Sequence, residues 1–136
     1  PGGAASGAAQ SRVASVELPK SSDAAVSPLA NVIYFDFDSY AVKDEFRPTL
    51  EAHAKALVAN RKKQLSIEGH TDERGGREYN LALGQRRSEA VMKATVLLGV
   101  TDSQLEAVSF GKERPAAPGH DEAAWAKNRR AELVVH

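Results

Sequence analysis

The sequence contains no cysteine, which excludes disulfide bonds, thiolate metal ligands and a cysteine nucleophile. It also has no excess of charge, because 18 basic side chains balance 18 acidic ones. No field across the whole chain therefore favours nucleic acid or an anionic membrane surface, and we expect no nucleic-acid partner. No apolar run is long enough to span a bilayer, no signal peptide is present and Pro1 stands first, so we expect a soluble chain trimmed from a longer one.

The composition divides the 136 residues into two parts. Residues 1–30 are rich in Ala, Ser, Gly and Pro without sustained periodicity, which predicts a flexible tether or arm. Residues 31–136 are long enough for one domain with a hydrophobic core. We therefore expect a single folded domain behind a tether.

Hydrophobic periodicity predicts the order of elements in that domain. We expect strands at 32–37, 64–70, 105–110 and 132–135, and helices at 44–60, 79–98 and 121–128. Pro48 should lie in the first turn of its helix, and Gly99 should end the next one. The order β-α-β-α-β-(α)-β predicts an α/β (α+β) two-layer sandwich, with helices packed on one face of a mixed sheet.

Arg87 lies where the second long helix should face the sheet, four residues after Leu83 and four before Val91. Its stem could pack while the guanidinium reaches water. Alternatively, it extends into a cleft and offers its planar fork to a carboxylate. Gly84 costs about 1 kcal/mol against alanine in a helix interior. It could permit close approach of a ligand or another backbone, or be a packing accommodation.

Aspartates follow two of the predicted strands. Asp36 and Asp38 flank Phe37 at the end of the first, and Asp72 follows the second, where a turn or cap is its common role. Neighbouring strand ends could bring Asp38 and Asp72 together beside Arg87. Such a site suits a zwitterion, with its ammonium on the aspartates and its carboxylate on Arg87 and on free N–H groups at a helix start. Without ligand, we expect Arg87 to pair with a protein carboxylate.

An enzymatic site is the alternative interpretation. Glu68, His70 and Asp72 could form an acid–base set, or a metal site with His53. Ser66, Glu68 and His70 alternate with Leu65 and Ile67, however, as in a half-buried strand, and the sequence has no HExxH motif or nucleophile elbow. We therefore predict no catalytic residue, metal or cofactor.

Four polar residues near the C-terminus have simpler expected roles. His120 should be a loop residue, and Asp121 should stabilise the start of the short helix. Alternation places Arg129 and Arg130 on different faces, so we expect one to support the loops and the other to point outward.

Four blocks resemble the OmpA-like C-terminal domain family: YFDFDSY, GHTDERG with REYN and ALGQRRSEAV, FGKERP, and GHDEAAWAKNRR. The resemblance covers residues 31–136, and YFDFD with GHDEAAW narrows it to lipoproteins of Gram-negative bacteria that associate with peptidoglycan. It implies a non-enzymatic domain that holds the peptidoglycan stem peptide through its meso-diaminopimelate. By position, Asp72 and Arg87 match the pair that brackets diaminopimelate, and Asp38 matches a further ligand carboxylate. Four positions match residues that line or brace the pocket: Phe37, Arg74, Asn80 and Leu83.

The resemblance also implies a place in the cell envelope: the periplasmic face of the outer membrane, reached through a lipid anchor whose cysteine this sequence lacks. We therefore expect an engineered or truncated form. Implied partners are peptidoglycan and the periplasmic β-propeller protein of the Tol system, which acts in envelope integrity and cell division. The alternatives are a cell-wall hydrolase or metal-dependent enzyme using His70 and Asp72, or the wall-binding domain of a flagellar stator or porin. Gly76–Arg77 replaces the usual Thr-Pro, so we expect a looser helix start and an added charge near the pocket.

Overall fold

The helices and strands follow the predicted order. The computed structural model describes residues 30–136, so the predicted tether lies outside the described residues except for Ala30. The elements are β2 (Val32–Tyr34), η2 (Asp44–Phe46), α2 (Arg47–Ala59), β3 (Leu65–His70), α3 (Arg77–Leu97), η3 (Asp102–Gln104), β4 (Leu105–Gly111), α4 (Glu122–Asn128) and β5 (Arg130–Val135). Pro48 lies in the first turn of α2, and Gly99 follows α3 with a positive φ of 103°, both as predicted.

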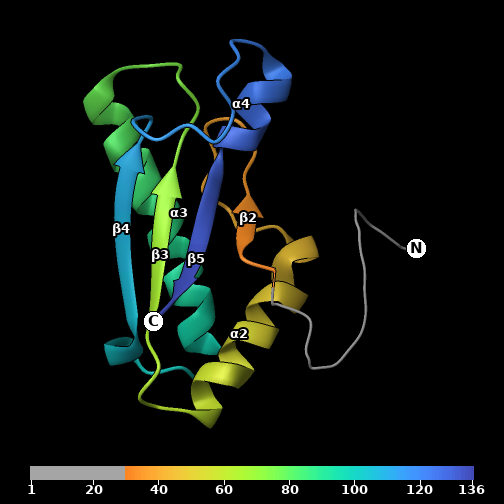
Figure 1. Cartoon of the computed structure of the whole chain (residues 1–136), viewed down its shortest axis with the longest axis vertical. Helices are drawn as coiled ribbons and strands as arrows, with labels where there is room; N and C mark the ends of the chain where they lie inside the picture. The colour runs from red at the N-terminus through yellow and green to blue at the C-terminus, as the bar shows by residue number, and fades with distance from the viewer. Residues whose placement is uncertain (1–29) are drawn as a thin grey trace. The chain divides into compact units, whose positions relative to one another are not determined.

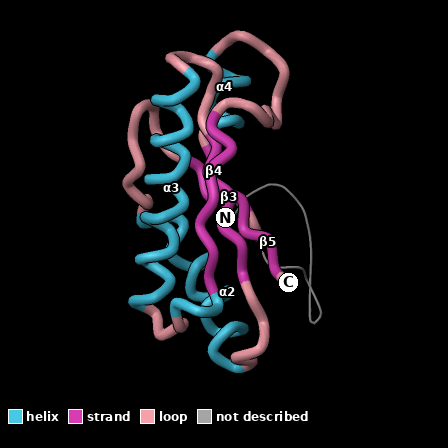
Figure 2. Tube along the Cα trace, turned by 90° about the vertical axis from the view of Figure 1, so that its left-hand side faces the viewer, coloured by secondary structure: helices cyan, strands magenta, loops and turns pink. Residues whose placement is uncertain are grey.

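The four strands form one mixed sheet in the order β2-β5-β3-β4 (Figure 1). β3 pairs in parallel with β4, whereas β5 is antiparallel to both of its neighbours. Figure 2 shows α2 and α3 on one side of the strands, and α4 lies beyond the carboxyl ends of β3 and β4. The predicted two-layer α/β architecture is therefore confirmed.

The hydrophobic core fills the space between the sheet and the two long helices. Alternate residues of the strands face the helices, and residues three or four apart on each helix face the sheet. The buried core contains Ile33, Phe35, Leu50, Ala54, Leu57, Leu65, Ile67, Val91, Val100, Ala131 and Leu133.

Two glycines bring α3 unusually close to β3. A Cβ at Gly69 would lie 1.8 Å from the carbonyl oxygen of Gly84, and a Cβ at Gly84 would lie 2.3 Å from the Ser109 Oγ. Gly84 therefore permits the close approach of another backbone, that of Gly69, which is one of the roles that the sequence left open. This contact fixes the start of α3 beside the end of β3.

Three local predictions were wrong. β2 ends at Tyr34 because the chain turns at Phe37 and Asp38, where Asp38 has a φ of 54°. β3 is more buried than the half-buried strand that was predicted: on its outer face Ser66 and His70 are buried beside side chains of β4, and Glu68 alone among its residues is partly exposed. Arg129 and Arg130 are both buried, because each guanidinium finds acceptors inside the protein.

Candidate functional site

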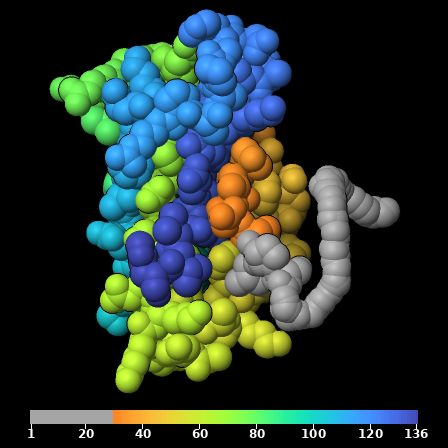
Figure 3. Space-filling view, viewed as in Figure 1, coloured from red at the N-terminus to blue at the C-terminus, as the bar shows by residue number. Residues whose placement is uncertain are grey.

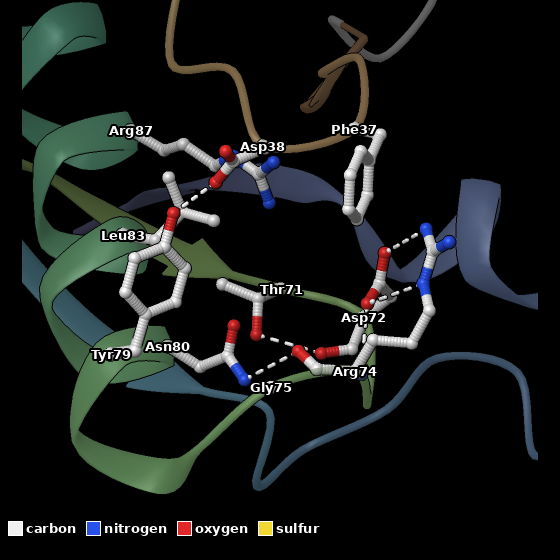
Figure 4. A pocket seen from close by; sticks show the side chains of 10 residues that line it. All are labelled: Phe37, Asp38, Thr71, Asp72, Arg74, Gly75, Tyr79, Asn80, Leu83 and Arg87. Atoms are coloured by element: carbon white, nitrogen blue, oxygen red, sulfur yellow. Dashed lines mark hydrogen bonds and ion pairs between the residues drawn. The ribbon is translucent and has the colours of Figure 1, made fainter.

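A cavity of about 200 Å³ opens between the carboxyl end of β3, the first turns of α3 and the turn after β2 (Figure 4). All seven residues predicted for the site line it: Phe37, Asp38, Asp72, Arg74, Asn80, Leu83 and Arg87. The other lining residues are Thr71, Gly75 and Tyr79. The structure therefore brings together groups from three separate segments, while their role in binding stays a prediction.

Arg87 is fully buried in the inner wall of this cavity. Its Nε donates to the Ser39 carbonyl at 2.7 Å, Nη1 to the His70 carbonyl at 2.9 Å and Nη2 to the Asp36 carbonyl at 3.1 Å. The guanidinium therefore does not reach bulk water. Among residues 30–136 it also has no carboxylate partner at ion-pair distance, so the expected protein pairing was wrong. The turn after β2 and the end of β3 supply carbonyl oxygens instead.

The charge of Arg87 is only partly compensated. Burial lowers its pKa to about 10, while the fields of Asp72 and Asp38 act in the opposite direction. The group remains protonated at neutral pH. A guanidinium has five N–H donors, and the three carbonyls leave one free on each terminal nitrogen. An incoming carboxylate would find both a charge and a pair of donors there.

The carboxylate of Asp72 is buried, and its two oxygens already accept several hydrogen bonds. Its Oδ1 accepts from the Arg74 main-chain N–H at 2.9 Å and from Arg74 Nε at 3.3 Å, and its Oδ2 accepts from Arg74 Nη2 at 2.8 Å and from Arg129 Nη1 at 3.5 Å. Burial alone would raise the pKa of Asp72, but the bonds from Arg74 and Arg129 outweigh it and hold the pKa below its usual value. These donors occupy about as many positions as a carboxylate offers.

Arg74 lies between two aromatic rings. Its guanidinium carbon is 4.2 Å from the ring centre of Phe37 and 4.1 Å from that of Trp125 in α4. Trp125 Nε1 donates to Glu73 at 2.7 Å, and His120 Nδ1 lies 2.7 Å from the same carboxylate. Sequence reasoning missed Trp125 and Glu73 because the contacts of Trp125 with Arg74 and Glu73 depend on where α4 sits. The predicted Asp121 cap that starts α4 is confirmed, since its carboxylate accepts from the Ala124 N–H at 3.0 Å.

Asp38 is the exposed carboxylate of the cavity. The Tyr79 hydroxyl donates to it, and this is the one side-chain hydrogen bond that Asp38 makes in the described part of the chain. Tyr79 was not among the predicted site residues, but it is about half exposed and lines the cavity. Its spacing from Leu83 and Arg87 on one helical stripe was the signal that could have identified it.

The start of α3 lies at the cavity edge. Its N-cap is Gly76, without a side-chain hydrogen bond to the first turn. A helix start of this kind leaves main-chain donors available to an anion. Arg77 is mostly exposed, lies 3.6 Å from Glu113 and does not line the cavity, so the added charge that we expected there is directed elsewhere.

The acid–base set considered as an alternative does not assemble. His70 is absent from the cavity lining, and its ring groups with Glu68 and Glu132 rather than with Asp72 or His53. Burial, together with the nearby charges of Arg130 and Arg114, lowers the pKa of His70 to about 4. The ring is therefore neutral at neutral pH and lacks the second proton of an imidazolium, which is the one that a general acid would donate.

The fold and the cavity define a class: an α/β domain with a cavity lined by both acidic and basic side chains beyond the end of its central strand. The chain belongs to the OmpA family, whose family model matches residues 34–129. Between residues 30 and 136, no helix has the length and apolar character of a membrane span.

Curated relatives and solved structures agree with this assignment. The peptidoglycan-associated lipoprotein of Pseudomonas aeruginosa is 53% identical over 112 residues, or 82% of this chain and 66% of the relative. That of Pasteurella multocida is 50% identical over 104 residues, or 76% of this chain and 69% of the relative. The crystal structure of the peptidoglycan-associated lipoprotein from Burkholderia pseudomallei is 57% identical, with a TM-score of 0.78, covering 79% of this chain and 91% of that one.

The fold also resembles a more distant protein. The C-terminal domain of Helicobacter pylori MotB has a TM-score of 0.71 at 25% identity, covering 79% of this chain and 84% of that one. The chain spans 60% to 69% of the length of the first four curated relatives.

Proposed function

We propose that this domain binds the stem peptide of peptidoglycan non-covalently, through the zwitterionic end of meso-diaminopimelate. The domain makes and breaks no bond. The names of the relatives, peptidoglycan-associated lipoprotein, support peptidoglycan as the partner. Asp38, Asp72 and Arg87 are the proposed ligand-binding residues, and Phe37, Arg74, Asn80 and Leu83 are proposed to support them.

One observation carries the proposal: Arg87 is a buried cation without a carboxylate partner at ion-pair distance among residues 30–136. Burying a charge is costly unless an opposite charge compensates it. A ligand carboxylate in the cavity would supply that charge and accept from the two remaining N–H donors. The uncapped start of α3 offers further donors at the edge of the cavity.

The ligand ammonium would lie between Asp38 and Asp72. Asp38 is exposed and makes one side-chain hydrogen bond within residues 30–136, so it has lone pairs to offer. Asp72 is saturated, and an ammonium therefore reaches it by displacing Arg74, whose side chain is 34% exposed. The two rings that flank Arg74 can hold its cation while the ammonium occupies that place.

The cellular role follows by analogy with the relatives. We propose that the full-length protein is lipid-anchored on the periplasmic face of the outer membrane and links that membrane to the cell wall. The β-propeller protein of the Tol system is a proposed second partner, within a system that maintains envelope integrity during division. The tether proposed for residues 1–30 would span the distance between lipid and domain.

Calorimetric titration with two muropeptides tests the ligand chemistry. We expect the diaminopimelate form to bind about tenfold or more tightly than its lysine counterpart, because lysine lacks the side-chain carboxylate proposed to meet Arg87. Arg87→Lys and Asp38→Asn should each weaken binding of the first form without changing the circular dichroism spectrum. Asp36→Asn is the matched control, since Asp36 belongs to the same turn but pairs with Lys43 at 2.8 Å outside the cavity.

Equal affinity for both muropeptides would show that the domain does not recognise the side-chain carboxylate of diaminopimelate. Sedimentation with purified sacculi separates binding from catalysis, because a binder leaves the muropeptide profile unchanged whereas a hydrolase releases fragments. Released fragments would overturn the proposal that the domain only binds.

A further inference from the structure

We infer that the face of the sheet opposite α2 and α3 carries a site for a divalent transition-metal ion, formed by Glu68, His70 and Glu132. One donor atom from each of these side chains lies within 4.8 Å of the others. Glu68 and His70 are two residues apart on β3 and so share a face, while β5 supplies Glu132. Figure 3 shows atoms of β3 and β5 at the surface of this side of the molecule.

The two glutamates stand directly opposite each other in the antiparallel pairing of β3 and β5. Like charges in this position destabilise a sheet. Arg130 relieves only one of them, because its Nε donates to Oε2 of Glu132 at 2.6 Å. The side chain of Glu68 has no hydrogen bond or ion pair with any residue that the structure describes. The charge of Arg114 also acts on the His70 ring, but its guanidinium carbon lies 3.8 Å from the ring centre of Phe110 and pairs with neither glutamate among residues 30–136, so Glu68 keeps a carboxylate without a bonded cation.

His70 provides an independent reason to expect a ligand. Its side chain is buried, with 2% of the residue exposed, and its ring stacks on Phe110 with 5.5 Å between the ring centres. Neither ring nitrogen has a hydrogen-bond partner within residues 30–136. A buried polar atom without a partner is costly and rare in folded proteins. A metal ion bound to one nitrogen would provide that partner.

The donor set indicates the kind of ion. Imidazole nitrogen together with carboxylate oxygen suits zinc and neighbouring transition metals, whereas calcium and magnesium take oxygen donors. Arg130 contacts one oxygen of Glu132, which leaves the other for the ion. The glutamates are only partly buried, so small rotations can bring their oxygens to bonding distance, and a fourth position stays open to water.

The site is separate from the proposed ligand cavity. None of its three residues lines that cavity, and Gly69, between Glu68 and His70, points the other way, towards α3. A negative result for peptidoglycan would therefore leave the metal site untouched, and the reverse also holds.

A zinc titration followed by NMR of the histidine side chains tests the inference. The chain has four histidines, and loss of a signal in His70→Gln assigns the His70 ring. We expect that ring to shift and to saturate at one equivalent of Zn²⁺. Glu68→Gln should weaken the affinity at least tenfold, and it is the informative variant because the Glu68 side chain has no hydrogen bond or ion pair to lose within the described part of the chain.

Glu106→Gln is the matched control. Glu106 lies on β4 and accepts a hydrogen bond from Ser66 on the same face, but it is outside the cluster, so its loss should leave zinc affinity unchanged. Shifts confined to His120 or His136 would overturn the inference, as would zinc affinity that is equal in the wild type and in Glu68→Gln. An unmoved His70 ring at millimolar Zn²⁺ would also overturn it and would point to bound water as the partner of the ring.

Discussion

At the scale of single residues, Arg87 shows where sequence reasoning succeeds and where it stops. Helical spacing placed it correctly on the inward stripe of α3. Its partners are carbonyl oxygens of Ser39, His70 and Asp36, which come from segments that no local pattern connects to the helix. Side-chain direction is a local property, whereas the choice of partner depends on the tertiary fold.

Asp72 should make the stability of the domain depend on acid pH. Its pKa in the folded state is below its usual value, so between the unfolded pKa of about 3.9 and the folded one the unfolded chain binds more protons. The contribution of Asp72 is complete above pH ~4 and is lost as the pH falls through the folded pKa. Urea unfolding between pH 3 and 7 should show this loss in the wild type.

The Asp72→Asn variant provides the comparison. It should be about 1–3 kcal/mol less stable than the wild type at pH 7, because Arg74 and Arg129 lose their charged acceptor. Its stability should fall less steeply below pH 4. Parallel curves for the two proteins would show that other carboxylates dominate the acid response.

At the scale of elements, the close contact between α3 and β3 depends on two glycines, which carry no side chain. The main chains of Gly69 and Gly84 meet, so the helix start and the strand end hold Arg87 and Asp72 at one cavity. Sequence reasoning identified Gly84 as costly within the helix but could not pair it with Gly69, because their proximity arises only when the two elements pack.

Gly69→Ala should therefore destabilise the domain by about 2 kcal/mol or more, since a Cβ 1.8 Å from the Gly84 carbonyl oxygen forces the two backbones apart. Chemical denaturation measures the change. Gly76→Ala is the control, because a Cβ there meets nothing within 4 Å. Equal stability of both variants would mean that α3 can move away from β3 without loss.

At the scale of the whole molecule, the order of elements and the fold class were predictable, because periodicities of two and 3.6 residues record which faces are buried. The strand order β2-β5-β3-β4 was not predicted, since pairing between distant segments leaves no local pattern. For the same reason, the sequence did not reveal the cluster of Glu68, His70 and Glu132 on the face of the sheet opposite α2 and α3. Glu68 and His70 were recognised together, but Glu132 is 62 residues further along the chain than His70 (132 − 70) and joins them only through the pairing of β3 with β5.

The stacking of Arg74 on Trp125 gives the domain a built-in optical reporter. Trp125 is the one tryptophan in the sequence, and its indole touches the cation that the ligand ammonium is proposed to displace from Asp72. Saturating diaminopimelate muropeptide should therefore change the emission of unlabelled protein, with the same midpoint as calorimetry. Binding that leaves the fluorescence constant would show that Arg74 stays bonded to Asp72. The ligand ammonium would then contact Asp38 alone.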